Sequence, residues 1–274
     1  MDENYTPEEL LALEAAFDEA ASRADRALAW EECLNKYCAH VLHYHGGQQR
    51  KDLNEYWSLD RYDIAYGHGS HGHIGRDSVV NYFAGMNERW RDVKLKYFSE
   101  KYPDRITNDA PFLGVGDYCI HAIFSPHIQV AGDGQTATAY FHSPAICSEA
   151  DMNGDQGPMV EWGGYGVTFV RDRAGWKIWQ LRGYNDYIFF WPGEVVDHTD
   201  RPDPPFPPAA ERLLRERGES SPEPAPNFTA SCRGPMTRYR VAAVEPEMQA
   251  PYQTWNGSMS YVRDYPVAEK GGAS

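Results

Sequence analysis

Basic residues are scarce in this sequence relative to acidic ones. Its 274 residues include 26 lysines and arginines against 40 aspartates and glutamates, so the formal net charge is −14. Proteins that bind nucleic acid cluster lysine and arginine side chains against the phosphates. The deficit of positive charge therefore argues against a nucleic-acid partner and favours a ligand recognised by shape and apolar area.

Long apolar runs and paired cysteines are also missing. No stretch approaches the ~18 apolar residues that a membrane-spanning helix needs. The first residues lack the basic start and apolar core of a secretory signal. The five cysteines include no CxxC pair, so we expect small apolar residues rather than a disulfide framework. These features predict a cytoplasmic protein without a membrane partner.

Motifs for phosphates, dinucleotides and an activated serine are absent. The segment from Gly67 to Gly75 does not place GxGxxG in a strand–turn–helix unit. Its histidines, His68, His71 and His73, could bind a metal ion, but an irregular loop does not fix ligand geometry and no HExxH motif accompanies them. We therefore expect neither a cofactor nor a metal ion, and histidines that face a pocket or solvent instead.

Aromatic residues are abundant, by contrast. They make up 14% of the chain and include 18 tyrosines and 8 tryptophans. Aromatic side chains bury large areas and also line pockets for flat ligands. The composition therefore suits an aromatic small-molecule substrate.

Helical periodicity dominates the first hundred residues. Thr6-Pro7-Glu8-Glu9 has the capping-box pattern of a helix start. A second helix is predicted from apolar residues at spacings of 3 and 4, and Gly46-Gly47 ends it. Shorter helices are expected over 53–59 and 79–90, with a short strand at 63–66 and an irregular loop at 67–73 between them. The stripe of the second helix consists of Ala27, Trp30, Leu34, Tyr37, Val41 and Tyr44.

From residue 117 the apolar period changes to two, which predicts strands. They are expected over 119–124, 128–130, 135–142, 161–171 and 176–184, with hairpin turns at 131–134 and 173–175. Helices followed by an antiparallel meander indicate an α+β fold.

Proline marks a change toward the C-terminus. Residues 197–274 hold 12 of the 19 prolines, which excludes long helices and central strands there. Aromatic residues such as Tyr252, Trp255 and Tyr261 favour a tail that wraps the surface, or a neighbouring subunit, over a free linker. We predict an N-terminal helix over 1–24, a domain over 25–192 and a Pro-rich extended tail over 193–274.

Several segments together resemble the SnoaL-like branch of the nuclear-transport-factor-2-like superfamily. Gly75-Arg76 resembles the family's helix start, residues 127–137 its central hairpin, and residues 165–179 its closing hairpin. The resemblance covers residues 25–192 and implies a cone, in which a curved antiparallel sheet wraps around a long helix and a deep apolar pocket. It also implies a homo-oligomer, a dimer or trimer built on the open face of the sheet.

The Gly-Asp-Gly hairpin and the Pro-rich tail resemble a subgroup of diarylpropane lyases, which remove formaldehyde from lignin-derived aromatic dimers without a cofactor. This resemblance implies general acid/base loss of water and formaldehyde from a diarylpropane to give a stilbene. Because one fold hosts many functions, two alternatives stay open. One is a dehydratase or isomerase of a steroid- or polyketide-like substrate, and the other is a non-catalytic ligand-binding module.

His121 is the leading candidate for acid/base chemistry. It lies mid-strand between Cys119 and Ile123, where the family often places a pocket histidine. A polar residue on an apolar strand face needs a buried partner or a cavity, so a satisfied core histidine is the alternative. His142 ends the next strand and is a second candidate of this kind.

Two further catalytic candidates are His40 and Tyr66. His40 borders the stripe of the long helix, which forms a pocket wall in the family, and Tyr66 lies where the family's isomerases often carry a tyrosine. The sequence has His43-Tyr44-His45 in place of the family's common aspartate near the helix end. Asp63 is the nearest alternative carboxylate.

Arg182 completes the catalytic candidates. At period two from Trp176 and Ile178, it is expected to face the pocket and to hold a phenolate or alkoxide. The alternative is a surface ion pair, and Glu161 is expected to pair with it rather than act as a base. The residues expected to contact substrate, many of which could instead be core, are Tyr37, His43, Trp57, Tyr62, Asp63, Tyr82, Phe83, His142, Trp162, Tyr165, Trp179 and Tyr184.

Overall fold

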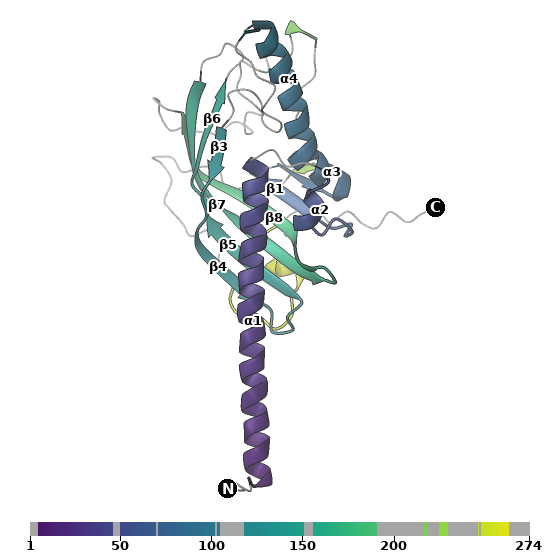
Figure 1. The fold of residues 1–274 in the computed structure, drawn as a ribbon, viewed down its shortest axis with the longest axis vertical. Coiled ribbons are helices and arrows are strands. Elements are labelled where there is room, and N and C mark those ends of the chain that lie inside the picture. Colours follow the sequence, from purple (N-terminus) through teal and green to yellow (C-terminus); the bar gives the residue numbers. More distant parts are fainter. Residues whose placement is uncertain are drawn as a thin grey trace, which may run out of the picture.

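The structure is a computed structural model. It describes residues 5–45, 50–69, 71–101, 103–104, 118–150, 156–190, 216–218, 225–229, 246 and 248–262. These residues form the predicted α+β fold, a curved, unclosed sheet packed against an N-terminal helix (Figure 1). Most of the predicted tail lies outside the described residues, as does the side chain of His43.

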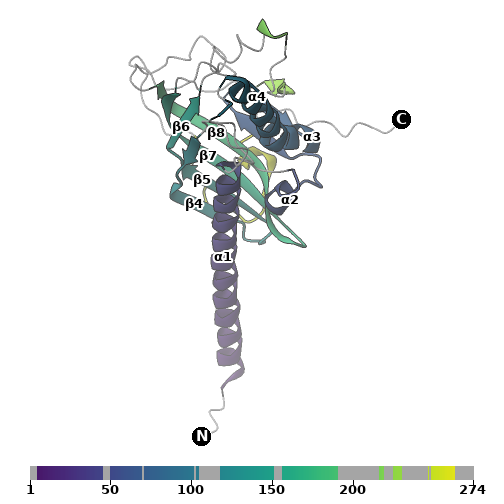
Figure 2. The same ribbon diagram turned by 45° about the horizontal axis from the view of Figure 1, so that its top comes forward.

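Helix α1 runs without a break from Pro7 to His45. It begins with the predicted capping box, in which Glu9 N donates to Thr6 Oγ1 at 3.2 Å and Thr6 N donates to the Glu9 carboxylate at 2.7 Å. The sequence predicted two helices here, but no proline or glycine separates them. The C-terminal half of α1 lies across the sheet, and the N-terminal half projects beyond it (Figures 1 and 2).

The buried stripe of α1 differs from the predicted one. Tyr37 and Val41 are buried as expected, but Trp30 is 36% exposed and Ala27 is exposed. The stripe starts instead with one alanine and one cysteine, which are small enough to let the helix approach the sheet but stand out little in a hydrophobic pattern. The buried residues are Ala29, Cys33, Tyr37, His40 and Val41.

The short helix α2 (Leu53–Tyr56) is fastened to strand β8 (Gly175–Phe190). Trp57 forms a parallel bridge with Ile178, and Lys177 Nζ donates to two carbonyl oxygens in the last turn of α2, at 2.7 and 3.0 Å. A lysine at a helix C-terminus satisfies carbonyls that have no partner within the helix.

A β-hairpin lies where the sequence predicted an irregular loop. Strands β1 (Ala65–His68) and β2 (His71–Ile74) pair antiparallel, with Gly67 opposite Gly72. Gly69 has φ of 55°, the left-handed conformation that a tight turn requires. The prediction is wrong because glycines do not prevent strand pairing where other segments pack closely.

One helical segment follows the hairpin and consists of α3 (Arg76–Val80), the π-helix η1 (Asn81–Gly85) and α4 (Met86–Lys101). It covers the helix predicted over 79–90. A π-turn adds a residue within a helix and often occurs at functional sites.

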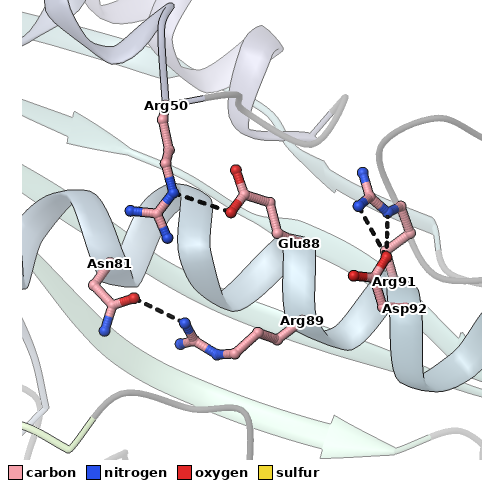
Figure 3. Close-up of polar contacts among 6 residues, drawn as sticks. All are labelled: Arg50, Asn81, Glu88, Arg89, Arg91 and Asp92. Atoms are coloured by element: carbon pink, nitrogen blue, oxygen red, sulfur yellow. Dashed lines mark hydrogen bonds and ion pairs between the residues drawn. The ribbon is translucent and has the colours of Figure 1, made fainter.

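Two polar contacts hold the region of the π-helix η1. Arg89 Nη1 donates to Asn81 Oδ1 at 2.8 Å, and Arg50 Nε donates to Glu88 at 3.0 Å (Figure 3). A Cβ at Gly85 would lie 2.5 Å from Arg50 Nη2. The glycine therefore lets the segment before α2 pack against this helix.

The remaining strands complete a single sheet of nine strands within the described ranges. Seven of them follow the order β3-β6-β7-β8-β1-β2-β9, and β4 and β5 lie off this path. Strand β5 pairs with β4 and with the second half of β7, so the hairpins predicted around 131–134 and 173–175 are confirmed. The pairing of β1 with β8 is parallel. The bounds are β3 (Tyr118–His121), β4 (Phe124–Val130), β5 (Thr136–His142), β6 (Ala145–Ala150), β7 (Gln156–Asp172) and β9 (Phe228–Thr229).

The tail residues 248–262, which include the short helix η2 (Gly257–Met259), lie on the face of the sheet opposite α1, called the outer face here. Gly132 N donates to the carbonyl of Tyr252 at 2.9 Å. Trp255 packs on Trp179 with ring centroids 4.4 Å apart. The ring of Tyr261 lies over the backbone of β7, so this part of the tail covers apolar surface.

The main core fills the space between α1 and the sheet. Its largest fully buried side chains include Trp57, Phe141, Phe169 and Ile178. In the part of the chain that the structure describes, no helix combines the length and apolar character needed to span a bilayer.

Candidate functional site

Strand β7 carries two polar side chains on the face that α1 covers. Glu161 and Tyr165 have the same parity along the strand as the core residues Val167 and Phe169. Because side chains alternate between the two faces of a sheet, all four lie on the α1 side. The carboxylate and the phenol are therefore directed toward the core rather than toward the tail.

Strands β1 and β8 bring two more polar groups to this face. His68 shares the parity of the core residue Tyr66, and Asn185 shares that of the core residue Leu181. Gly183 lies beside His68, and a Cβ there would stand 2.7 Å from His68 Cδ2. The glycine thus leaves room for the imidazole.

His68 contacts both polar neighbours through one nitrogen. Its Nε2 lies 3.1 Å from Asn185 Oδ1 and 3.8 Å from Glu161 Oε1. The His68 side chain is 30% exposed and that of Glu161 is 12% exposed. The carboxylate is therefore mostly shielded from solvent, while the histidine stays accessible from one side.

The charge state of Glu161 follows from these neighbours. Burial alone raises the pKa of its carboxyl group, but the hydrogen bond and charge of His68, together with the charge of His121, bring the pKa below its ordinary value. The carboxylate is consequently negative at neutral pH. A negative group at this distance stabilises a histidine cation.

His121 forms the second half of the cluster. Its Nδ1 lies 3.4 Å from Tyr165 Oη, and the two rings meet edge to face with centroids 5.8 Å apart. Both residues are partly exposed. We call His68, Glu161, His121, Tyr165 and Asn185 the polar cluster. It combines a carboxylate–histidine pair with a phenol–histidine pair. Side chains of these types can act as general acids and bases.

Aromatic side chains border the polar cluster. Tyr37 of α1 stacks on Phe141 with centroids 4.4 Å apart and lies 6.2 Å from Tyr165. Burial raises the pKa of the Tyr37 phenol well above its ordinary value, so it stays protonated. The rings of Tyr37 and Phe141 are both buried, so they support Tyr165 from the core side.

His40 lies in the core, and Tyr37 packs near both its ring and that of Tyr165. It is buried, with its ring 5.1 Å from that of Phe83, 5.7 Å from that of Trp57 and 6.4 Å from that of Tyr37. The predicted residues Tyr37, Trp57 and Phe83 therefore surround this histidine as an aromatic wall.

Tyr66 and Tyr82 form a further group on the same side of the sheet. Their hydroxyl oxygens are 3.4 Å apart, and His73 packs against both rings. His73 Nδ1 lies 3.0 Å from Ser78 Oγ. Burial, with the nearby charge of His71, lowers the pKa of His73 to about 4, so this ring is neutral at pH 7.

Arg182 does not face α1, contrary to the sequence-based expectation. The pairing of β7 with β8 skips Trp179, which makes a β-bulge between Ile178 and Gln180. Both Ile178 and Leu181 are therefore in the core, and Arg182 is directed to the outer face. There its Nη1 donates to the carbonyl of Tyr261 at 3.1 Å. The expected pair with Glu161 is also wrong, because Glu161 lies on the other face beside His68.

Other predicted contact residues lie away from the polar cluster. Asp63 accepts two hydrogen bonds from Arg61, each at 2.9 Å. Tyr62 and Trp162 are 52% and 50% exposed. Three more, His142, Trp179 and Tyr184, contact outer-face or tail residues, namely Tyr140, Trp255 and Arg182 in that order.

Two members of the polar cluster, His68 and Glu161, were not among the predicted catalytic residues. His68 lies two residues after Tyr66, which would place both on one face of a strand. The glycines around His68 suggested a loop instead. For Glu161, strand parity with Phe169 would have shown the inward direction. Sequence periodicity could not show that a parallel ladder brings the two residues together.

Among the described residues, no group of three or more His, Cys, Asp or Glu side chains is arranged to hold a metal ion. The hairpin register places His68 opposite His71 and Tyr66 opposite His73. The three histidines of this hairpin thus occupy different parts of the site.

The sequence profile of the SnoaL-like domain matches residues 26–182, which include every member of the polar cluster but Asn185. The chain belongs to the SnoaL-like family. No curated protein matches this SnoaL-like chain.

Several solved structures are similar to this SnoaL-like chain. A candidate scytalone dehydratase from Novosphingobium aromaticivorans DSM 12444 shares 11% identity with a TM-score of 0.44, over 66% of this chain and 99% of that chain. A hexachlorocyclohexane dehydrochlorinase, LinA type 3 from Novosphingobium barchaimii LL02, shares 12% identity with a TM-score of 0.43, over 64% and 98%. An NTF2-like protein from Novosphingobium aromaticivorans shares 20% identity with a TM-score of 0.38, over 65% and 90%.

Proposed function

We propose that this SnoaL-like chain is a cofactor-independent lyase that removes water and formaldehyde from a lignin-derived diarylpropane diol and leaves a stilbene. The observation that supports an acid/base lyase is the polar cluster, where a carboxylate–histidine pair and a phenol–histidine pair lie beside aromatic rings. The choice of substrate rests on the subgroup resemblance of the Gly-Asp-Gly hairpin and the Pro-rich tail.

His68 is the proposed general acid. The Glu161 carboxylate, 3.8 Å away, favours the protonated imidazole, and Asn185 holds the same nitrogen. Proton transfer from His68 to the benzylic hydroxyl allows that group to leave as water. A free phenol on the adjacent ring stabilises the resulting cation as a quinone methide.

His121 is the proposed general base. In the tautomer whose Nδ1–H is directed to Tyr165 Oη, 3.4 Å away, Nε2 carries the lone pair that accepts the proton of the terminal hydroxyl. The oxygen electrons then form the C=O bond of formaldehyde while the adjacent C–C bond breaks. The electron pair of the broken C–C bond forms the stilbene double bond. In one turnover His68 gives up one proton and His121 accepts one.

In this proposal an aryl group of the substrate packs on the partly exposed ring of Tyr165. Tyr37 and Phe141, both buried, hold that ring from the core side. His40 and Tyr66 support the wall from the buried side, and Arg182 has no part in catalysis because it is directed to the outer face.

The test is incubation of purified protein with a phenolic 1,2-diarylpropane-1,3-diol, followed by assays of formaldehyde and of stilbene absorbance. Both products should form in equal amounts, and a chelator should not change the rate. His121→Gln and His68→Gln should each lower kcat by about 100-fold. His127→Gln is the matched control, because this histidine contacts the tail carbonyl of Gln249 instead of the polar cluster.

If the protein releases formaldehyde from the diol no faster than buffer alone does, the proposed substrate is wrong. Loss of water without formaldehyde would favour the dehydratase alternative. Binding of the diol with no turnover, unchanged in both histidine variants, would favour a non-catalytic ligand-binding module.

A further inference from the structure

The N-terminal half of α1 carries an apolar stripe that nothing in the described chain covers. Residues 7–28, called the arm, project from the body of the protein (Figures 1 and 2). At 1.5 Å per residue the arm is about 33 Å long. Its exposed large side chains include Leu10 at 53%, Phe17 at 72% and Leu28 at 59%.

These side chains form one regular stripe, called the seam. It consists of Leu10, Leu13, Phe17, Ala21, Ala24 and Leu28, all exposed, at spacings of 3, 4, 4, 3 and 4. This is the helical period, so the six residues share one face. An exposed apolar stripe of this length is typical of a helix that packs against another helix.

The seam is not an extension of the face that packs on the sheet. At 3.6 residues per turn, the 16 positions from Phe17 to the core residue Cys33 correspond to about 160° around the helix. The seam therefore lies on the side of α1 opposite the body. A partner helix can approach it without meeting the sheet.

We propose that the seam binds the seam of a second copy of this chain, in antiparallel orientation. Charge favours this occupant and this direction. The first half of the arm, residues 7–19, carries five acidic and no basic side chains. Residues 20–30 carry Arg23 and Arg26 against the single acid Asp25. A parallel pair would align the acidic halves, whereas an antiparallel pair sets each against two arginines.

Side-chain size supports the same register. In an antiparallel pair with residue 19 of one copy opposite residue 19 of the other, Leu10 faces Leu28 of the other copy. In the same register Phe17 faces Ala21 of the other copy. Leu13 then lies next to Ala24, so two of the three contacts set a large side chain against a small one. Alternation of large and small residues lets two helices pack closely. Glu14 also comes next to Arg23 of the other copy in this arrangement.

Light scattering tests the association in the full chain. Leu13→Glu with Phe17→Glu should halve the mass of the assembly. Ala12→Glu with Ala15→Glu is the matched control, because it adds the same charge to exposed positions on the other side of the arm. An unchanged mass for the seam variant, or an equal loss for the control, overturns the proposal.

Cross-linking tests the orientation independently of stability. Leu10→Cys and Leu28→Cys proteins, mixed and treated with a short bis-maleimide, should give covalent dimers that neither protein gives alone. Wild type sets the background from the native cysteines, of which Cys33 and Cys147 are buried and Cys38 is partly exposed. Cross-linking of each variant by itself would indicate a parallel pair, and no product from the mixture would exclude the antiparallel one. Either result overturns the proposed orientation.

Discussion

Gly183 and His68 lie side by side in the parallel ladder between β8 and β1, and the missing side chain at Gly183 makes room for the imidazole. A Cβ at this position would stand 2.7 Å from His68 Cδ2 and 3.2 Å from Tyr165 Cε1. A single added Cβ would thus crowd both halves of the polar cluster. The arrangement explains why this buried position of β8 is a glycine rather than a residue with a side chain.

Gly183→Ala should therefore displace the His68 ring from Glu161. A misplacement of about 1 Å in a catalytic group can cost 100-fold in rate, and we expect a loss of about that size in kcat/KM for formaldehyde release. Gly257→Ala is the matched control, because a Cβ there meets nothing within 4 Å and the residue is far from the cluster. An unaltered kcat/KM in Gly183→Ala would show that the position of His68 does not matter.

Glu161→Gln should change how activity depends on pH. The lowered pKa of Glu161 keeps a negative charge beside His68 at neutral pH, and glutamine removes the charge while keeping the shape. A histidine cation without its counter-charge gives up its proton more easily. The alkaline limb of the kcat/KM profile should thus move to lower pH. A profile of the same shape in Glu161→Gln would contradict the role of the carboxylate.

The buried His73 should make stability depend on pH. Burial lowers its pKa to about 4, while an unfolded histidine titrates near 6.5. Between these values the unfolded state binds more protons, so His73 destabilises the fold as the pH falls from 6.5 toward 4. From pH 7 to pH 5 the loss is about 2 kcal/mol. Urea unfolding at both pH values should show this loss in wild type and a smaller one in His73→Asn.

Gly166→Ala should loosen the tail. A Cβ at Gly166 would clash with Tyr261 Cγ, the ring atom next to the tail backbone, rather than with a flexible end of the side chain. The ring must move away from the sheet, which exposes residues 248–262 to protease. Limited proteolysis should cut the tail faster in Gly166→Ala. Adding Gly166→Ala to Tyr261→Ala should have little further effect, because the clashing ring is already gone.

Much of the fold was predictable because it rests on local patterns. The alternation around residues 127–142 and 161–184 predicted two hairpins, and the capping box at Thr6 predicted the helix start. The predicted helix stripe was less accurate, since Ala29 and Cys33 contribute little to a hydrophobic pattern. The hairpin at Gly67 was missed because glycine signals turns more often than strands.

The candidate site was predictable only in part. His121 was predicted from its place on a strand, although it is the last residue of β3 rather than mid-strand. Tyr165 was listed only among aromatic residues that could instead belong to the core. The orientation of Arg182 was wrong because parity along β8 holds only until the bulge at Trp179, and a bulge depends on pairing with a neighbouring strand. A local pattern cannot show such an extra residue.

The sequence by itself determined the fold class and the family, because both follow from the order and period of apolar residues along the chain. Only the tertiary structure decided which polar groups meet. His68 reaches Glu161 through the parallel ladder of β1 with β8 and the antiparallel ladder of β8 with β7. Those contacts join segments far apart in the chain, and no spacing within the sequence encodes them.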